Sequence, residues 1–185
     1  MKRMVLILIC AFLCVGLLTA CSSSDKTGTT QTPTSSGQSD AKGKVVDPVT
    51  LITQDEAAGI LGEPSKPAEV KTSAINPLGQ KEVIFSPVND QSFKMLQLSF
   101  IQNEGMNKDK VASGYNVKKL YEDTRKGFAD AKDVNGIGDQ AFMRPSWLHV
   151  VKGNTYFVIY INNKATDAQK EEAAKSLAMK IISRL

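Results

Sequence analysis

The stretch that decides the fold is Trp147–Ile161, WLHVVKGNTYFVIYI, in which two apolar runs flank the dipeptide Gly153-Asn154. A Gly-Asn dipeptide between two such runs is typical of a two-residue β-hairpin turn. With this turn, Lys152 faces Thr155 and Trp147 faces Tyr160, which sets the register of the whole pair. The sequence therefore predicts an antiparallel hairpin.

The two faces of this hairpin differ in composition. Alternation along each strand gives one plainly apolar core face: Leu148, Val150, Phe157, Ile159 and Ile161. The other face holds Trp147, His149, Val151, Tyr156, Val158 and Tyr160, which include the only tryptophan and the only histidine of the chain. Aromatic side chains with a polar end suit a half-wet binding surface, so Trp147, His149, Tyr156 and Tyr160 are our candidate binding surface. The alternative is that a helix covers this face and both faces are core.

Further strands and helices are predicted on both sides of the hairpin. Alternating apolar residues and turn residues predict the strands, which are 68–75, 81–88, 93–101, 140–144 and 146–152, with 155–161 as the second hairpin strand. Helical periodicity predicts a helix at 115–129, and capping boxes at Thr53 and Thr166 begin a helix that ends near Leu61 and a C-terminal helix. We expect an α+β fold, an antiparallel sheet of about six strands with helices packed on it, in the order αβββαβββα.

The N-terminus has the pattern of a secretory signal. Lys2 and Arg3 precede an uncharged apolar run from Met4 to Ala20, which is short for a stable membrane span. Leu18-Thr19-Ala20-Cys21 resembles the lipobox of bacterial lipoproteins, and that resemblance implies cleavage before Cys21 and a diacylglycerol on its sulfur. Two or three acyl chains hold a protein firmly on a membrane. The alternative is a cleaved secreted protein or a single anchoring helix.

A polar segment separates this signal from the folded part. Residues 22–46 are rich in Ser, Thr, Gly and Gln and contain no aromatic residue, so we expect them to remain disordered. We therefore divide the chain into a signal peptide (1–20), a lipidated cysteine with its tether (21–48) and one globular domain (49–185). Residues 47–185 contain 18 basic and 17 acidic side chains, and this balance does not favour nucleic-acid binding.

Few residues of the domain suit catalysis or metal binding. All three cysteines, Cys10, Cys14 and Cys21, precede the domain, and one histidine without cysteine does not build the usual zinc or copper site. No G-x-S-x-G motif occurs, and a calcium loop centred on Gly136 lacks acidic ligands at its first and twelfth places. Gly136-Ile137-Gly138-Asp139 is read as a tight turn entering a strand, with an anion cradle as the alternative. We expect no enzyme activity, no metal and no cofactor.

Several segments together resemble a family. The family consists of uncharacterised bacterial secreted lipoproteins with a PsbP-like fold, which is an antiparallel sheet with helices packed against it. The segments that resemble it are LITQDEAAGILGEP (51–64), VNGIGDQAF (134–142), WLHVVKGNTYFVIYI and the Ala-rich last helix. The resemblance covers about Thr50 to Leu185 and brings no catalytic residues.

These patterns predict a lipid-anchored protein on the extracytoplasmic side of the cell membrane, or on the outer membrane of a diderm. We expect a monomeric, non-enzymatic binding or accessory module for an envelope partner. The alternative function is a carrier of a small apolar ligand in a cavity between the sheet and the helices.

Overall fold

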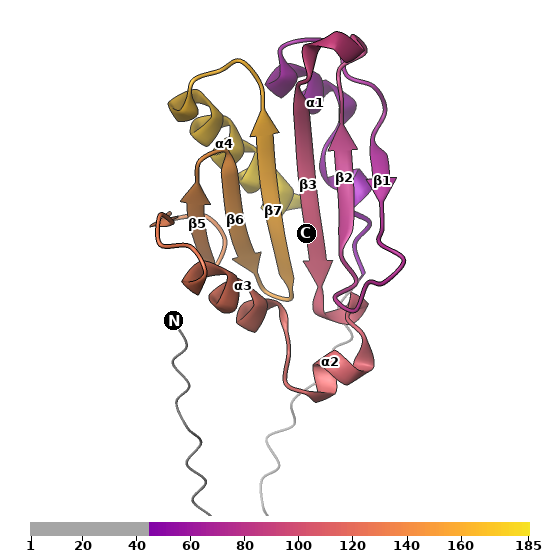
Figure 1. The fold of residues 1–185 in the computed structure, drawn as a ribbon, viewed down its shortest axis with the longest axis vertical. Coiled ribbons are helices and arrows are strands. Elements are labelled where there is room, and N and C mark those ends of the chain that lie inside the picture. The colour runs from indigo at the N-terminus through magenta and orange to yellow at the C-terminus, as the bar shows by residue number, and fades with distance from the viewer. Residues whose placement is uncertain (1–44) are drawn as a thin grey trace, which may run out of the picture. The chain divides into compact units, whose positions relative to one another are not determined.

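A single antiparallel sheet dominates the computed structural model, which describes residues 45–185 (Figure 1). The seven strands lie in the order β1-β2-β3-β7-β6-β5-β4. Their bounds are β1 Glu69–Lys71, β2 Lys81–Phe85, β3 Met95–Gln102, β4 Lys132–Asp133, β5 Gln140–Arg144, β6 Trp147–Lys152 and β7 Thr155–Asn162. The helices are α1 Gln54–Leu61, α2 Lys108–Ala112, α3 Val117–Lys126 and α4 Asp167–Arg184, with 3-10 turns at Pro48–Leu51, Asp90–Ser92 and Asn103–Gly105. The predicted signal peptide, Cys21 and most of the tether lie outside the described residues.

The predicted hairpin is confirmed in its register. β6 and β7 pair with Lys152 opposite Thr155 and Trp147 opposite Tyr160. β7 is also the long inner partner of β3, to which it is paired over eight residues from Met95–Asn162 to Gln102–Thr155. Both strands of the hairpin are therefore inner strands of the sheet, which explains why they are the most apolar stretch of the domain.

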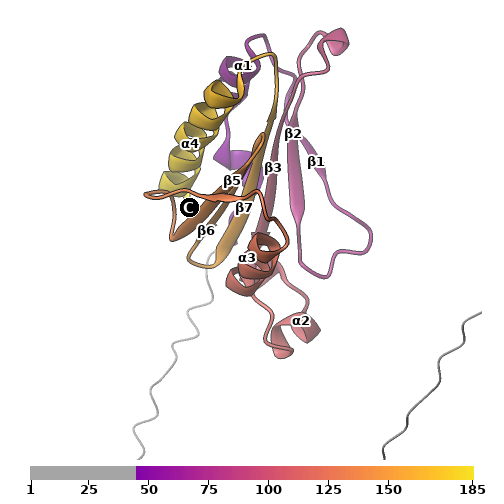
Figure 2. The same cartoon turned by 60° about the vertical axis from the view of Figure 1, so that its left-hand side comes forward.

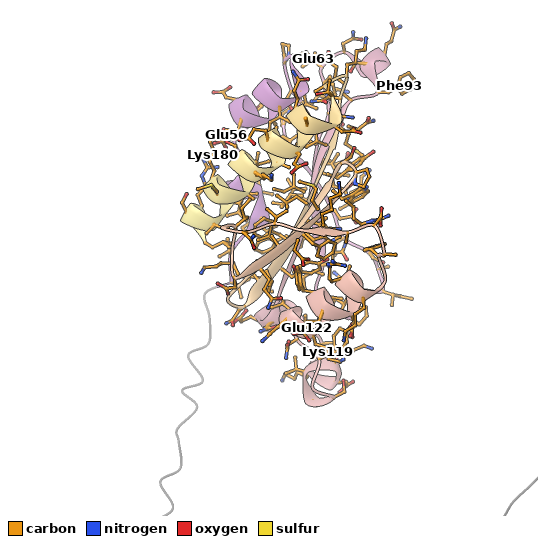
Figure 3. The ribbon with its side chains drawn as sticks, turned by 90° about the vertical axis from the view of Figure 1, so that its left-hand side faces the viewer. Glu56, Glu63, Phe93, Lys119, Glu122 and Lys180 are labelled. Atoms are coloured by element: carbon orange, nitrogen blue, oxygen red, sulfur yellow. The ribbon has the colours of Figure 1, made fainter. Side chains whose placement is uncertain are left out.

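Helices α1 and α4 cover one face of the sheet (Figure 2). Both predicted capping boxes are present, with Thr53 and Glu56 beginning α1 and Thr166 and Gln169 beginning α4. The core beneath these helices contains the five apolar hairpin residues predicted for it, all at most 1% exposed. A capping residue of α1 also binds α4: the Glu56 carboxylate accepts hydrogen bonds at 2.7 and 2.8 Å from the two terminal nitrogens of Arg184. Figure 3 places Lys180 beside the same carboxylate.

The strand count and the element order differ from the prediction. The described residues contain seven strands and four α-helices, since β4 precedes β5 and α2 precedes α3. β4 is two residues long, too short for alternation to form a pattern. Helix α2 is five residues long, and it begins where the Asn107 side chain accepts the Asp109 amide at 2.7 Å. The strand predicted at 68–75 is shortened to Glu69–Lys71.

The loop from β4 to β5 is a tight turn, as predicted. Gly136 and Gly138 both have positive φ, and a Cβ at Gly138 would lie 2.6 Å from the Val151 carbonyl oxygen. The Asp139 carboxylate accepts hydrogen bonds from the Lys152 ammonium at 2.8 Å and the Gly153 amide at 2.7 Å. The glycines thus allow the loop to pack on β6, and Asp139 fastens it to the hairpin turn.

Helix α3 lies on the opposite face of the sheet and covers only its lower half in Figure 2. Val117 and Tyr121 from α3 pack on a second, smaller core, which contains Ile101, Met106, Phe142, Val151, Tyr156 and Val158. We call this part of the second face the covered half. The alternative in which a helix covers the hairpin's second face is therefore correct for this half alone.

Candidate functional site

The part of the second face beyond α3 is crossed by one row of directly paired residues. The row runs over six strands and consists of Glu69, Ile84, Gln97, Tyr160, Trp147 and Arg144, which we call the open row. At about 4.8 Å between strands it is about 24 Å long. Of its members only Ile84 is as little as 9% exposed, and the others are half-buried or exposed. The open row is therefore a largely accessible strip.

Two aromatic rings stand at the centre of the open row. Trp147 and Tyr160 are stacked, with their ring centroids 4.3 Å apart and their planes at 27°. They come from β6 and β7, where the hairpin register places them opposite each other. The stack fixes both side chains, so little conformational entropy remains to be lost on binding. It therefore offers a rigid, half-wet contact of the kind enriched at interfaces.

Arg144 ends the open row at the last residue of β5. Its guanidinium carbon lies 3.6 Å from the centre of the Phe128 ring, and its Nε donates to the Asp130 carboxylate at 3.3 Å. Stacking of this kind stabilises arginine and holds its plane in one orientation. The Arg144 side chain is still 30% exposed.

A cleft of about 330 Å³ opens beside Arg144. It lies between the β5–β6 turn, the segment before β4 and the first turns of α4. Met143 and Ala174 provide apolar lining, and the charged lining consists of Asp130, Lys132, Arg144, Asp167, Lys170 and Glu171. The cleft lies on the α4 side of the sheet, where Met143 and Ala174 belong to the first core, whereas the open row crosses the second face. Arg144 borders both, and the open row is the candidate functional site.

The covered half holds a buried polar pair. His149 is 6% and Tyr156 4% exposed, and the histidine Nδ1 lies 2.7 Å from the tyrosine hydroxyl oxygen. The His149 ring also stacks on Phe142 at 4.2 Å. Burial, with a smaller effect of the Arg144 charge, lowers the pKa of His149 to about 4. Burial raises the pKa of Tyr156 to about 12. Both side chains are therefore neutral near pH 7.

The four predicted surface residues fall on both sides of the boundary set by α3. Trp147 and Tyr160 are brought together in the open row, whereas His149 and Tyr156 are buried in the covered half and present no surface to a partner. The prediction that His149 and Tyr156 belong to an exposed binding surface is therefore wrong, because helix α3 packs on them. The predicted lipid attachment at Cys21 lies outside the described residues.

Sequence reasoning missed Arg144 and Gln97 as members of the site. A signal for Arg144 was present, since it precedes Pro145-Ser146, and a two-residue turn there places it opposite Trp147. Gln97 faces Tyr160 only through the pairing of β3 with β7, and no local pattern reveals which distant strands pair.

Within residues 45–185, no group of three or more His, Cys, Asp or Glu side chains is arranged to hold a metal ion. None of the helices in this part of the chain is long and apolar enough to cross a membrane. No family model, no curated protein and no solved structure matches the chain. The resemblance to lipoproteins of PsbP-like fold thus stays a prediction.

Proposed function

We propose that this protein is a lipid-anchored binding module that acts outside the cytoplasm and contacts an envelope partner through the open row. The observation that supports it is the stacked Trp147–Tyr160 pair, which helix α3 leaves uncovered on the second sheet face. A stacked aromatic pair on an accessible strip is the type of anchor on which binding energy concentrates. The domain is a monomeric, non-enzymatic accessory part in this proposal.

The anchor in this proposal is a diacylglycerol on Cys21, which follows the lipobox residues Leu18-Thr19-Ala20. The tether then supplies reach of about 25–30 Å for some 25 residues. The domain is placed on the outer side of the cell membrane, or on the outer membrane of a diderm. Cys21→Ala should release the protein from the membrane fraction, and metabolic labelling with a fatty acid should be lost in the same variant.

The alternative of a carrier for a small apolar ligand receives no support from a specific observation. Such a ligand requires an enclosed apolar cavity. The space between the sheet and α1 and α4 is filled by side chains such as Val150, Ile159 and Ile181, each 0% exposed.

Site-specific photocrosslinking in membranes of the native host tests the binding module. A photoreactive phenylalanine analogue replaces Tyr160 in one variant and Met179 in the other, which is 60% exposed on α4. We expect a discrete crosslinked species from position 160 that is absent from position 179 and weakened by Trp147→Ala. Equal patterns from both positions would contradict the proposal.

A further inference from the structure

The three described arginines differ in how their side chains are engaged. Arg125 uses all three nitrogens, donating to the Asp133 carboxylate at 3.0 Å and to the carbonyl oxygens of Phe128 and Ala131. Arg184 uses both terminal nitrogens, on Glu56 and on the Leu51 carbonyl oxygen. Arg144 donates only through Nε, and no acceptor among the described residues engages its two terminal nitrogens.

The plane of the Arg144 guanidinium is nevertheless held in place. Phe128 stacks on it at 3.6 Å, Asp130 holds Nε, and the side chain remains 30% exposed. A guanidinium presents its terminal N–H groups as a planar fork that matches a carboxylate. An immobilised fork with free donors has already lost the rotamer freedom that binding removes. This geometry is that of a preorganised recognition group for an anion.

We propose that the open row binds an extended peptide segment of its partner, with an Asp or Glu carboxylate on Arg144 and the apolar side chain two residues further along against Trp147 and Tyr160, since alternate side chains of an extended peptide face the same way. This inference rests on the proposed use of the open row and adds the chemistry of the partner. Arg144, Trp147 and Tyr160 are successive members of the row and span about 10 Å, the length of about three extended residues.

The ligand class follows from the two kinds of contact that the row offers. The cleft beside Arg144 is lined by three acidic and three basic side chains, so its charges balance before a ligand binds and do not themselves select the anion. A peptide also supplies the apolar side chain that the aromatic pair requires, whereas an inorganic anion does not. An acidic and an apolar residue two positions apart therefore match the site in both charge and shape.

Fluorescence of Trp147, the only tryptophan of the chain, reports binding directly. The full chain in lipid nanodiscs is titrated with acetyl-Ala-Glu-Ala-Leu-Ala-amide, in which Glu and Leu face the same way when the peptide is extended, and with the same peptide carrying Gln in place of Glu. Since a hydrogen-bonded charge is lost with Gln, we expect the Glu peptide to bind at least about tenfold more tightly. In Arg144→Gln the two peptides should bind equally, and Arg144→Lys should keep only part of the preference.

The matched control is Lys118→Gln, which removes the same charge from the exposed outer side of α3 and should leave the preference intact. The inference is overturned if the unaltered chain binds both peptides equally, if it binds neither at millimolar concentrations, or if Arg144→Gln keeps the preference. It is also overturned if inorganic phosphate or glucuronate shifts the emission at lower concentration than the Glu peptide. If one of these results occurs while crosslinking from position 160 persists, the proposed binding module is retained and only the inference of an acidic peptide as its ligand is rejected.

Discussion

His149 and Trp147 are two residues apart on β6, point to the same face of the sheet and belong to the same predicted surface, yet they have opposite environments. His149 is 6% exposed and shares a hydrogen bond with Tyr156, whereas Trp147 is half-buried and stacks on Tyr160. The strands and the register are the same for both residues. What differs is helix α3, which packs on one half of the face and leaves the other. Residue type and strand periodicity therefore identify a face, and only tertiary packing decides which part of it meets a partner.

The largest effect is expected from truncating a ring in the covered half. Phe142 is 0% exposed and its ring lies near those of Tyr121, Phe128 and His149. Phe142→Ala should lower the free energy of unfolding by about 3–5 kcal/mol, because it leaves a cavity. Tyr160→Ala removes a ring of similar size from the open row and should cost about 1–2 kcal/mol. Urea denaturation measures both, and equal losses would contradict the division of the face.

Between pH 6.5 and 4.5, a pH dependence of stability is expected from His149 in the covered half. The folded protein holds the pKa of His149 at about 4, below its ordinary 6.5. The unfolded chain therefore takes up this proton first as the pH falls. The stabilisation is present in full above pH 6.5, declines below it and is lost through pH 4, a total of about 3 kcal/mol. Urea denaturation between pH 7 and pH 4 measures the decline.

His149→Asn is the control for this titration, because its amide does not titrate and can still bond the Tyr156 hydroxyl. The variant should lack most of the decline between pH 6.5 and 4.5. Hydrogen bonds from Arg184 hold the pKa of Glu56 well below its usual range. That stabilisation is present above pH 4.5 and is lost at lower pH, in a separate window. A decline between pH 6.5 and 4.5 that persists in His149→Asn would show that another group causes it.

Much of the fold could be predicted from the sequence, because the long elements show a clear periodicity and their ends carry recognisable turn and capping residues. The hairpin register followed from Gly153-Asn154, and the capping boxes placed the starts of α1 and α4 at Thr53 and Thr166. β4 and α2 were missed because two and five residues do not establish a period. The shortening of β1 was missed because its residues at 68–75 have a suitable composition, although only three of them pair with β2.

The candidate site was accessible only in part. The hairpin alone brings Trp147 opposite Tyr160, so local sequence was sufficient for the centre of the open row. Whether α3 would cover Tyr156 or Tyr160 depends on contacts between distant segments, such as the one between Tyr121 and Tyr156, whose ring centroids are 6.0 Å apart. The free terminal nitrogens of Arg144 depend likewise on Phe128 and Asp130, which precede it by more than ten residues.

A variant that weakens helix α3, which covers half of the second face, should have a smaller effect on the free energy of unfolding. The Asn116 side chain accepts the Lys119 amide at 2.9 Å and begins α3. Asn116→Ala should cost about 1 kcal/mol, and local opening should speed hydrogen exchange of the α3 amides about fivefold. Asn107→Ala removes the corresponding bond from α2, which is not part of the second core. If both variants speed exchange of the α3 amides equally, the cap of α3 is not what holds the cover in place.

The smallest effect is expected at the turn that joins Arg144 to Trp147. Ser146 has φ 65°, a left-handed conformation that costs a residue with a Cβ some free energy. Asparagine tolerates this region better, so Ser146→Asn should raise the free energy of unfolding by less than about 1 kcal/mol. Because the Ser146 carbonyl oxygen also accepts the Ile161 amide, the turn should keep its shape and peptide binding at the open row should be unchanged. Weaker binding in this variant would mean that the open row depends on the Ser146 side chain itself, which lines the cleft beside Arg144.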